Sequence, residues 1–352
     1  MAVQYATARR GRATAGRELG SGTSGLFTVA RPGARDEPRA VARPTIRVIT
    51  WNLFHGRDGL PGLGATRRST WLRRPEDDGV HVHLNRKLTA EMAQRIAAWD
   101  PDLCALQEVS TAGVREIAAA TGMQAVWTTT GPLIGPARLR NALAARNPDL
   151  WRTHEGNANA LLVGRRLRLV PESRRAVRLN PLRTIARDTR ELRLTRGELL
   201  RYLPEPRRLV LARVVPPGGG ELVAGSTHCH NSRDREVVGR EIVRAAHAVG
   251  EAAGDGPAVL AGDLNAPPSH PAFAALAAEG WEGAEPAAGM GIDRILHRGL
   301  EVVEEPRRLD PREREVLVTW GDRTRRVRLS DHDPVVAVLR ESGSPAERSG
   351  GR

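Results

Sequence analysis

The chain has 352 residues, of which 40% are apolar, enough to bury the core of one large domain or two small ones. No stretch approaches the roughly 20 apolar residues that span a bilayer. The two cysteines, Cys104 and Cys229, lie in short apolar runs typical of buried strands and exclude a disulfide framework. The net charge of +13 is compatible with a polyanionic substrate. Almost all of the basic residues are arginines, a bias typical of GC-rich genomes, so the charge is not itself a sign of nucleic-acid binding.

The two ends of the chain carry no apolar periodicity. Residues 1–44 are rich in Arg, Gly, Ala, Ser, Thr and Pro and predict a disordered basic arm, and residues 341–352 predict a disordered tail. The arm has no apolar run behind its arginines, so it does not resemble a secretory signal. We expect a cytoplasmic monomer without stable membrane insertion, folded over residues 45–340.

Within residues 45–340, short apolar runs alternate with amphipathic patterns. In chain order, strands are predicted at 46–51, 103–106, 222–228, 258–261, 292–296 and 334–339. Apolar periodicity predicts helices over 88–99 and 238–249, and Asp100-Pro101 ends the first of them. The stretch 165–213 has no assignable pattern, and residues 306–328 are interpreted as a hairpin insertion. Strands mixed with helices favour a layered α/β sandwich.

Polar residues suited to chemistry follow the ends of the predicted apolar runs. Strands deliver their ends to a common edge of a sheet, where the sites of layered α/β folds gather. We therefore expect one cleft to hold Asn52, Glu108, His228, Asp263, Asn265, Asp293, Asp331 and His332.

This set of side chains suits metal-assisted hydrolysis. Glu108 and Asp331 offer the hard oxygen ligands that Mg²⁺ or Mn²⁺ prefers, and Asp263 can hold and polarise a water. His228 and His332 can donate protons or hydrogen bonds to an anionic transition state. The ensemble is typical of attack by water on phosphorus beside a divalent metal.

The remaining residues of the set support that chemistry. Asn52 and Asn265 are neutral, so they can bind phosphate oxygens or orient a carboxylate without repelling an anion. Asp293 can fix the tautomer of a histidine and raise its pKa, and we expect it to pair with His332. A nucleophilic Ser or Cys with a base beside it is not evident, which favours water as the attacking group.

Seven short motifs occur in order between residues 46 and 339. They are Thr50-Trp51-Asn52, Leu106-Gln107-Glu108-Val109, Asn159-Ala160-Leu161-Leu162, Ser226-Thr227-His228, Gly262-Asp263-Leu264-Asn265, Gly291-Ile292-Asp293-Arg294-Ile295 and Leu329-Ser330-Asp331-His332-Asp333-Pro334. Each alone is weak, but the ordered set resembles the endonuclease/exonuclease/phosphatase superfamily. That group contains deoxyribonuclease, exonuclease III-like repair enzymes, sphingomyelinases and inositol-polyphosphate phosphatases.

The resemblance implies a four-layer α/β/β/α sandwich of two packed mixed, mostly antiparallel sheets. It implies that Glu108 is the principal ligand of Mg²⁺ or Mn²⁺, with Asn52 and Asp331 near the metal. Asp263 would orient or deprotonate the attacking water, and Asn265 would steady the water or the phosphate.

For the phosphate and the leaving group, the resemblance implies three further roles. His332, paired with Asp293, would contact the scissile phosphate. His228 matches the deoxyribonuclease-like members, in which a histidine assists the leaving group. Asn159, in the NAxL strand of the family, would face the cleft and bind substrate.

Other histidines and the arginine pairs are open to simpler readings. His228 and His230 have a spacing that zinc sites also use, but no third ligand stands nearby, so His230 is read as structural or substrate-adjacent. His81 and His83 are read as loop residues, and His55 either lines the rim of the cleft or is structural. Arginine pairs such as Arg207-Arg208 usually form solvated surface, although one of them could bind substrate phosphates.

Three hypotheses follow for the function. The leading one is a metal-dependent phosphodiester hydrolase acting on DNA or RNA, motivated by His228 together with a basic charge that is compatible with such a substrate. The second keeps the chemistry but makes the enzyme a phosphatase or phospholipase acting on inositol phosphates or sphingomyelin; three Phe and two Tyr speak against insertion into a lipid surface. The third is an inactive nucleic-acid-binding protein, which would be expected to have lost some of the strand-end residues that are all present here.

Overall fold

The computed structural model describes residues 44–59, 76–84, 86–130, 136, 157–202, 206–218, 220–231, 235–283 and 291–342. Within these ranges the first strand begins at Thr45 and the last ends at Glu341. The predicted arm up to residue 43 and the predicted tail beyond residue 342 lie outside the described residues, so their disorder stays a prediction.

Six strands form the first sheet, with β1 and β4 as a parallel pair at its centre and antiparallel neighbours on both sides. Both faces of this sheet are covered, so six of the eight residues of β1 are buried and no polar alternation appears. In spatial order the strands are β12 (Leu300–Arg308), β15 (Val335–Glu341), β1 (Thr45–Asn52), β4 (Leu103–Ser110), β6 (Asn157–Val163) and β5 (Gln124–Thr129).

Five strands form the second sheet, and here β9 and β10 are the parallel pair. Its edge strand β7 and its neighbour β8 come from the stretch that the sequence left unassigned. Most residues of β7 are exposed, which removes the alternation that would have revealed a strand. In spatial order the strands are β11 (Asp293–Arg298), β10 (Ala258–Asp263), β9 (Leu222–His228), β8 (Arg208–Val215) and β7 (Arg168–Arg178).

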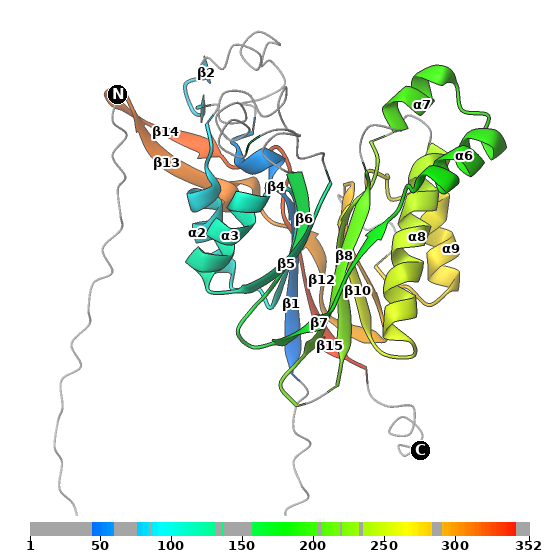
Figure 1. Ribbon diagram of the computed structural model, residues 1–352. Coiled ribbons are helices and arrows are strands. Elements are labelled where there is room, and N and C mark those ends of the chain that lie inside the picture. Colours follow the sequence, from blue (N-terminus) through cyan, green and yellow to red (C-terminus); the bar gives the residue numbers. More distant parts are fainter. Residues whose placement is uncertain are drawn as a thin grey trace, which may run out of the picture.

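Helices cover the outer face of each sheet, and the two sheets lie face to face between them (Figure 1). The helices α2 (Thr89–Trp99) and α3 (Thr111–Thr121) pack on the first sheet, and α8 (Arg235–Ala253) and α9 (Pro271–Ala278) pack on the second. Ser110 caps α3 by accepting a hydrogen bond from the backbone N–H of Gly113.

Three apolar layers hold these elements together. Val48 and Val259 belong to the layer between the two sheets, Trp51 and Met92 to the layer under α2 and α3, and Ile242 to the layer under α8 and α9. The arrangement confirms the predicted α/β/β/α sandwich, because each pair of neighbouring layers shares a buried apolar core.

The insertions add elements around this sandwich. The stretch 165–213 supplies α6 (Leu182–Glu191) and α7 (Arg196–Tyr202) in addition to β7 and β8. Residues 306–328 supply the predicted hairpin, formed by β13 (Glu315–Trp320) and β14 (Arg323–Arg328) after a 3-10 turn at Pro311–Arg314. A two-residue pair, β2 (Glu76–Asp77) and β3 (Val82–His83), lies in the loop after β1. Within the described ranges, no helix has both the length and the apolar composition needed to cross a bilayer.

The two parallel pairs bring four strand ends to one edge of the sandwich. The register places Asn52 opposite Gln107 in the first sheet and Asp263 opposite His228 in the second. Behind that edge, the Gln107 side-chain amide donates to Ser226 Oγ at 3.2 Å, from one sheet to the other. This buried bridge fixes the two sets of strand ends relative to each other.

Candidate active site

A cavity of about 260 Å³ at this edge brings together the residues that the sequence singled out. Its lining includes Glu108, His228, Asp263, Asn265, Asp331 and His332. Asn52 and Asp293 lie directly behind the wall: Asn52 Nδ2 donates to Asp263 Oδ2 at 3.0 Å, and Asp293 Oδ2 lies 2.8 Å from His332 Nδ1. All eight strand-end residues therefore meet around one opening.

Glu108 reaches the cavity through a bulge in β4. The pairing of β4 with β6 shifts between Leu106 and Val109, and Glu108 takes a left-handed φ of 49°, a conformation that is unfavourable for a non-glycine residue. Burial acts to raise the pKa of Glu108, but the neighbouring imidazoles, His55 foremost, bring it down to about 2. The group is therefore a carboxylate at neutral pH.

Asp263 is held through both of its oxygens. Oδ2 accepts from Asn52, and Oδ1 accepts from the backbone N–H of Asn265 at 3.0 Å. Burial, and after it the charge of Asp293, raises the pKa of Asp263 to about 7. A fixed carboxyl group with a pKa near neutrality is suited to accept a proton from water.

His332 is the positive counterpart of these acids. Burial acts to lower its pKa, but the hydrogen bond and charge of Asp293, helped by Asp263, raise it to about 10. Its backbone N–H donates to Ser330 Oγ at 3.1 Å, and that hydroxyl donates to the carbonyl of Asn52 at 2.6 Å. The predicted pairing with Asp293 is present, and it holds an imidazolium at the cavity wall.

His228 is electrically different from His332. Its Nδ1 lies 3.8 Å from Glu108 Oε1 and its Nε2 lies 3.4 Å from Asp263 Oδ2. Burial, followed by the charge of Arg207, lowers the pKa of His228 to about 3. His228 and His332 therefore carry different charges at neutral pH, because His228 is neutral and His332 is positive.

Asn265 and Asp331 complete the predicted set. Asn265 takes a left-handed φ of 51°, and its side-chain amide donates to the carbonyl of Cys229 at 2.9 Å, which fixes it beside Asp263. The Asp331 side chain is 42% exposed, the most open of the cavity acids. Burial raises the pKa of Asp331, and the charge of Glu108 raises it further.

The structure places Asn159 away from the cavity lining. Its amide donates to the carbonyl of Arg208 at 2.7 Å, and the residue is buried. Asn157, two positions earlier, and Arg207, just before β8, line the cavity instead. The substrate-binding role predicted for Asn159 thus stays a prediction, and these two neighbours are the better placed polar groups.

Phe54, which no sequence pattern indicates, and His55, whose pattern allows either a rim or a structural position, both line the cavity. They form a 3-10 turn after β1 and take left-handed φ values of 57° and 47°. His55 Nε2 lies 3.2 Å from Glu108 Oε2. The direction of these side chains follows from that turn, which no strand pattern reveals.

The donors around Glu108 fit a hard divalent cation. Glu108 and Asp331 face the same cavity, and the charge of Glu108 acts to raise the pKa values of both Asp331 and Asp263, as expected of acids gathered at short range. A cation would relieve this repulsion. A second group of close ligand atoms, Asp263, Asp293 and His332, is already engaged in hydrogen bonds within the protein.

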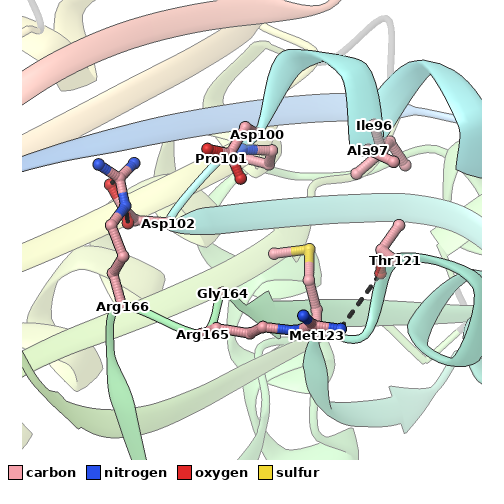
Figure 2. A pocket seen from close by; sticks show the side chains of 10 residues that line it. All are labelled: Ile96, Ala97, Asp100, Pro101, Asp102, Thr121, Met123, Gly164, Arg165 and Arg166. Carbon is pink, nitrogen blue, oxygen red and sulfur yellow. Dashed lines mark hydrogen bonds and ion pairs between the residues drawn. The ribbon is translucent and has the colours of Figure 1, made fainter.

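A second cavity, of about 220 Å³, lies at the opposite end of β4 and lacks this chemistry (Figure 2). Its buried acid, Asp102, accepts from the backbone N–H of Arg47 at 2.8 Å and pairs with Arg166, whose Nε lies 2.7 Å from Asp102 Oδ1. Figure 2 shows Arg165 lying across the opening beside Met123. The acid there is held in a structural ion pair, so this cavity lacks the group of acids and imidazoles that lines the strand-end cavity.

A layered α/β fold gathers carboxylates, amides and imidazoles around one strand-end cavity, an arrangement suited to the hydrolysis of phosphate esters. The sequence profile described as the Endonuclease/Exonuclease/phosphatase family matches residues 49–332, and the chain belongs to that family. Enzymes of this family are generally dependent on divalent metals. Among curated proteins, no sequence match was found.

Solved structures share the fold at low sequence identity. An endonuclease/exonuclease/phosphatase family protein from Bacteroides thetaiotaomicron superposes with a TM-score of 0.54 at 14% identity, covering 86% of this chain and 100% of that one. A mannosyl-6-phosphatase from the same organism gives 0.53 at 14%, covering 84% and 99%. The human Nocturnin catalytic domain with a bound sulfate anion gives 0.51 at 16%, covering 85% and 96%. At these identities the likeness concerns the fold alone.

Proposed function

We propose that the protein is a metal-dependent phosphodiester hydrolase that acts on DNA or RNA. The observation that carries the proposal is the charge division of the cavity: Glu108 and Asp331 supply anionic oxygens, while His332 and Arg207 supply positive charge to the same opening. A phosphodiester bridges such a site, because its anionic oxygens need donors and the attacking water needs a carboxylate.

Asp263 acts on the attacking water. The hydrogen bonds from Asn52 and from the backbone of Asn265 fix the carboxylate, so it can hold a water in one orientation and accept its proton. The side chain of Asn265 is anchored beside it and offers its amide oxygen to the same water.

His332 acts on the phosphate. Its pKa, raised by Asp293, keeps the imidazole protonated, so Nε2–H can donate to a phosphoryl oxygen whose negative charge grows in the transition state. Arg207 and Asn157 also line the cavity and are proposed to bind the non-bridging oxygens and the adjoining sugar. When bound at Glu108 and Asp331, a divalent cation would polarise the phosphoryl group.

The leaving group requires a proton donor. His228 is neutral because of its burial and the nearby Arg207, so we assign it a hydrogen-bonding role between Glu108 and Asp263. The protonated His332 carries a proton at neutral pH and is the better acid, so its Nε2–H, first bonded to the phosphate, is proposed to pass to the departing oxygen as the P–O bond breaks.

A second candidate, a phosphomonoesterase, is favoured by the small volume of the cavity. A space of about 260 Å³ holds a single phosphate and part of one sugar ring. One of the fold relatives is a mannosyl-6-phosphatase. A nucleic acid would therefore have to extend beyond the cavity over the surrounding surface.

A matched pair of chromogenic esters separates the two candidates. Full-length protein is assayed with bis(p-nitrophenyl) phosphate, a diester, and with p-nitrophenyl phosphate, a monoester, in the presence of Mg²⁺ or Mn²⁺, with plasmid and single-stranded oligonucleotides in parallel. We expect the diester and the nucleic acids to be cleaved, and Asp263→Asn to lower kcat by about 10²–10⁴-fold, the usual share of a general base.

Arg175, an exposed residue of β7, supplies the control variant Arg175→Gln, which is expected to leave kcat unchanged. Release of phosphate from the monoester without any diester cleavage would establish the second candidate. Hydrolysis of neither ester, or hydrolysis that Asp263→Asn leaves intact, would refute the proposal.

A further inference from the structure

Two imidazoles flank the carboxylate of Glu108, one beside each oxygen. His55 Nε2 lies 3.2 Å from Oε2, and His228 Nδ1 lies 3.8 Å from Oε1. Both histidine side chains are 9% exposed, and the Glu108 side chain is 20% exposed through the cavity. Two nitrogen donors and two oxygen donors thus converge on one small, partly open space.

Some histidine–carboxylate pairs of the described chain are direct hydrogen bonds, and others are wider, such as His228 Nε2 with Asp263 Oδ2 at 3.4 Å. Three such pairs are hydrogen bonds of 2.8 Å: His81 with Glu315, His247 with Glu279, and His332 with Asp293. The separations at Glu108 are longer. The 3.2 Å between His55 and Glu108 is close to the spacing of neighbouring ligand atoms around a cation, which is about 3 Å for bonds of about 2.1 Å that meet at right angles, whereas the 3.8 Å of His228 is wider.

The position of His55 is set by the backbone around it. Leu53 N–H donates to the carbonyl of Gln107 at 2.9 Å, which ties the turn to β4 beside Glu108. On its other side, the carbonyl of Gly56 accepts from Leu88 N–H at 2.7 Å, at the start of α2. The turn is held at both ends, so His55 is directed at Glu108 by the scaffold.

In the other candidate cluster, most of the ligand atoms already take part in hydrogen bonds within the protein. Asp263 accepts hydrogen bonds at both oxygens, and the ring nitrogen Nδ1 of His332 is bonded to Asp293. Placing a cation there would break contacts that orient the water-activating group. By contrast, Glu108, His55 and His228 all line the cavity, and the distances between their ligand atoms are 3.2 and 3.8 Å.

We propose that His55 is a nitrogen ligand of the metal site at Glu108, an inference that rests on the proposed function. The site then offers both nitrogen and oxygen ligands and binds Mn²⁺ more tightly than Mg²⁺. Mg²⁺ takes oxygen ligands almost exclusively, whereas imidazole is a good ligand for transition metals. His228 faces the second oxygen of Glu108 and is the other nitrogen that a cation could reach.

The test measures the metal environment directly. Metal-free, full-length protein is titrated with Mn²⁺ and with Mg²⁺ by calorimetry, and the Mn²⁺-loaded protein is studied by electron spin echo envelope modulation after labelling of histidine with ¹⁵N. We expect nitrogen coupling to Mn²⁺ in the natural protein. In His55→Gln, which replaces a nitrogen donor with an oxygen donor, we expect shallower nitrogen modulation, a Mn²⁺ affinity lower by about 10-fold, and a Mg²⁺ affinity changed by less than about 2-fold.

The controls separate this inference from the proposed function. His247→Gln, at a side chain that is 55% exposed, should behave as the natural protein, and Glu108→Gln should lose Mn²⁺ binding. Mn²⁺ that binds without nitrogen coupling, or with coupling unchanged in His55→Gln, would refute the role of His55 while leaving phosphodiester hydrolysis intact. Absence of Mn²⁺ binding together with absence of hydrolysis would refute both. The nitrogen coupling is measured on the natural protein, so the proposal can still be refuted if His55→Gln folds poorly.

Discussion

Asp293→Asn tests whether the charge of His332 is set by its partner. The pair is joined at 2.8 Å, and the pKa of His332 lies at about 10 against an ordinary value of 6.5. That difference corresponds to a preference of about 5 kcal/mol for the charged imidazole, at 1.36 kcal/mol for each pH unit. Burial opposes the effect, so the carboxylates supply more than the net amount, with Asp293 the largest contributor.

Removing the charge of Asp293 should therefore bring the pKa of His332 down to about 8 or lower, because Asp263 and Asp331 remain nearby. The pKa is measured by following the ring resonances of His332 during a pH titration of metal-free protein, with His332→Gln for assignment. In the diester assay, the natural enzyme should keep its activity toward pH 9, whereas Asp293→Asn should lose activity from about pH 8 upward as the imidazole gives up its proton.

The same pair makes a prediction about stability. The folded pKa of His332 is above the unfolded one, so the pair stabilises the fold fully below pH 6.5 and loses this contribution as pH rises toward 10. Denaturant unfolding should thus separate Asp293→Asn from the natural protein more at pH 6 than at pH 10. A natural His332 that titrates near 6.5, or a pKa equal in both proteins, would refute the reasoning.

Two further predictions concern the scaffold behind the cavity. Burial raises the pKa of Glu241 to about 7, so the fold loses stability as pH rises from about 4.5 to 7. In Glu241→Gln, whose amide oxygen can still accept from the N–H of His230, this loss of about 2–3 kcal/mol between pH 5 and 8 should disappear. Urea unfolding measures the free energy of unfolding at each pH, and equal pH slopes in the two proteins would contradict the prediction. Gly262 precedes Asp263, and a Cβ at this position would lie 2.0 Å from the carbonyl oxygen of Thr227. Gly262→Ala should therefore destabilise the protein by about 1–3 kcal/mol, measured by thermal denaturation, and lower kcat. Gly197→Ala, where the nearest atom to the added Cβ is 4.0 Å away, is the control and should be nearly neutral.

Much of the fold and site could be predicted because the central strands are buried on both faces. Continuous apolar runs such as 258–261 stand out in the sequence, and the polar residue that follows each parallel strand must emerge at the shared edge. Asn52, Glu108, His228 and Asp263 were found in this way. Asp293 was placed correctly, although it opens β11 and does not follow an apolar run, because β11 returns antiparallel beside β10 with Asp293 opposite Asp263.

Arg207 and Asn157 escape prediction for one shared physical reason, which differs from the turn geometry that hides Phe54 and His55. Arg207 precedes β8, which runs antiparallel to β9, and Asn157 opens β6, which runs antiparallel to β4. In an antiparallel neighbour the amino end, not the carboxyl end, meets the catalytic edge. A search for polar residues after strands therefore overlooks them, and only knowledge of strand direction, which is a tertiary property, recovers them.

The cavity depends on contacts that cross between the two sheets. Asn52, from the first sheet, holds Asp263 of the second; His332, just before β15 of the first sheet, pairs with Asp293 of the second; and Gln107 bonds Ser226 behind them. Without the other sheet, neither the oriented carboxylate nor the charged imidazole would have its partner. Catalysis therefore requires the face-to-face docking of the sheets, and a change that loosens their apolar interface should lower activity before it alters the secondary structure.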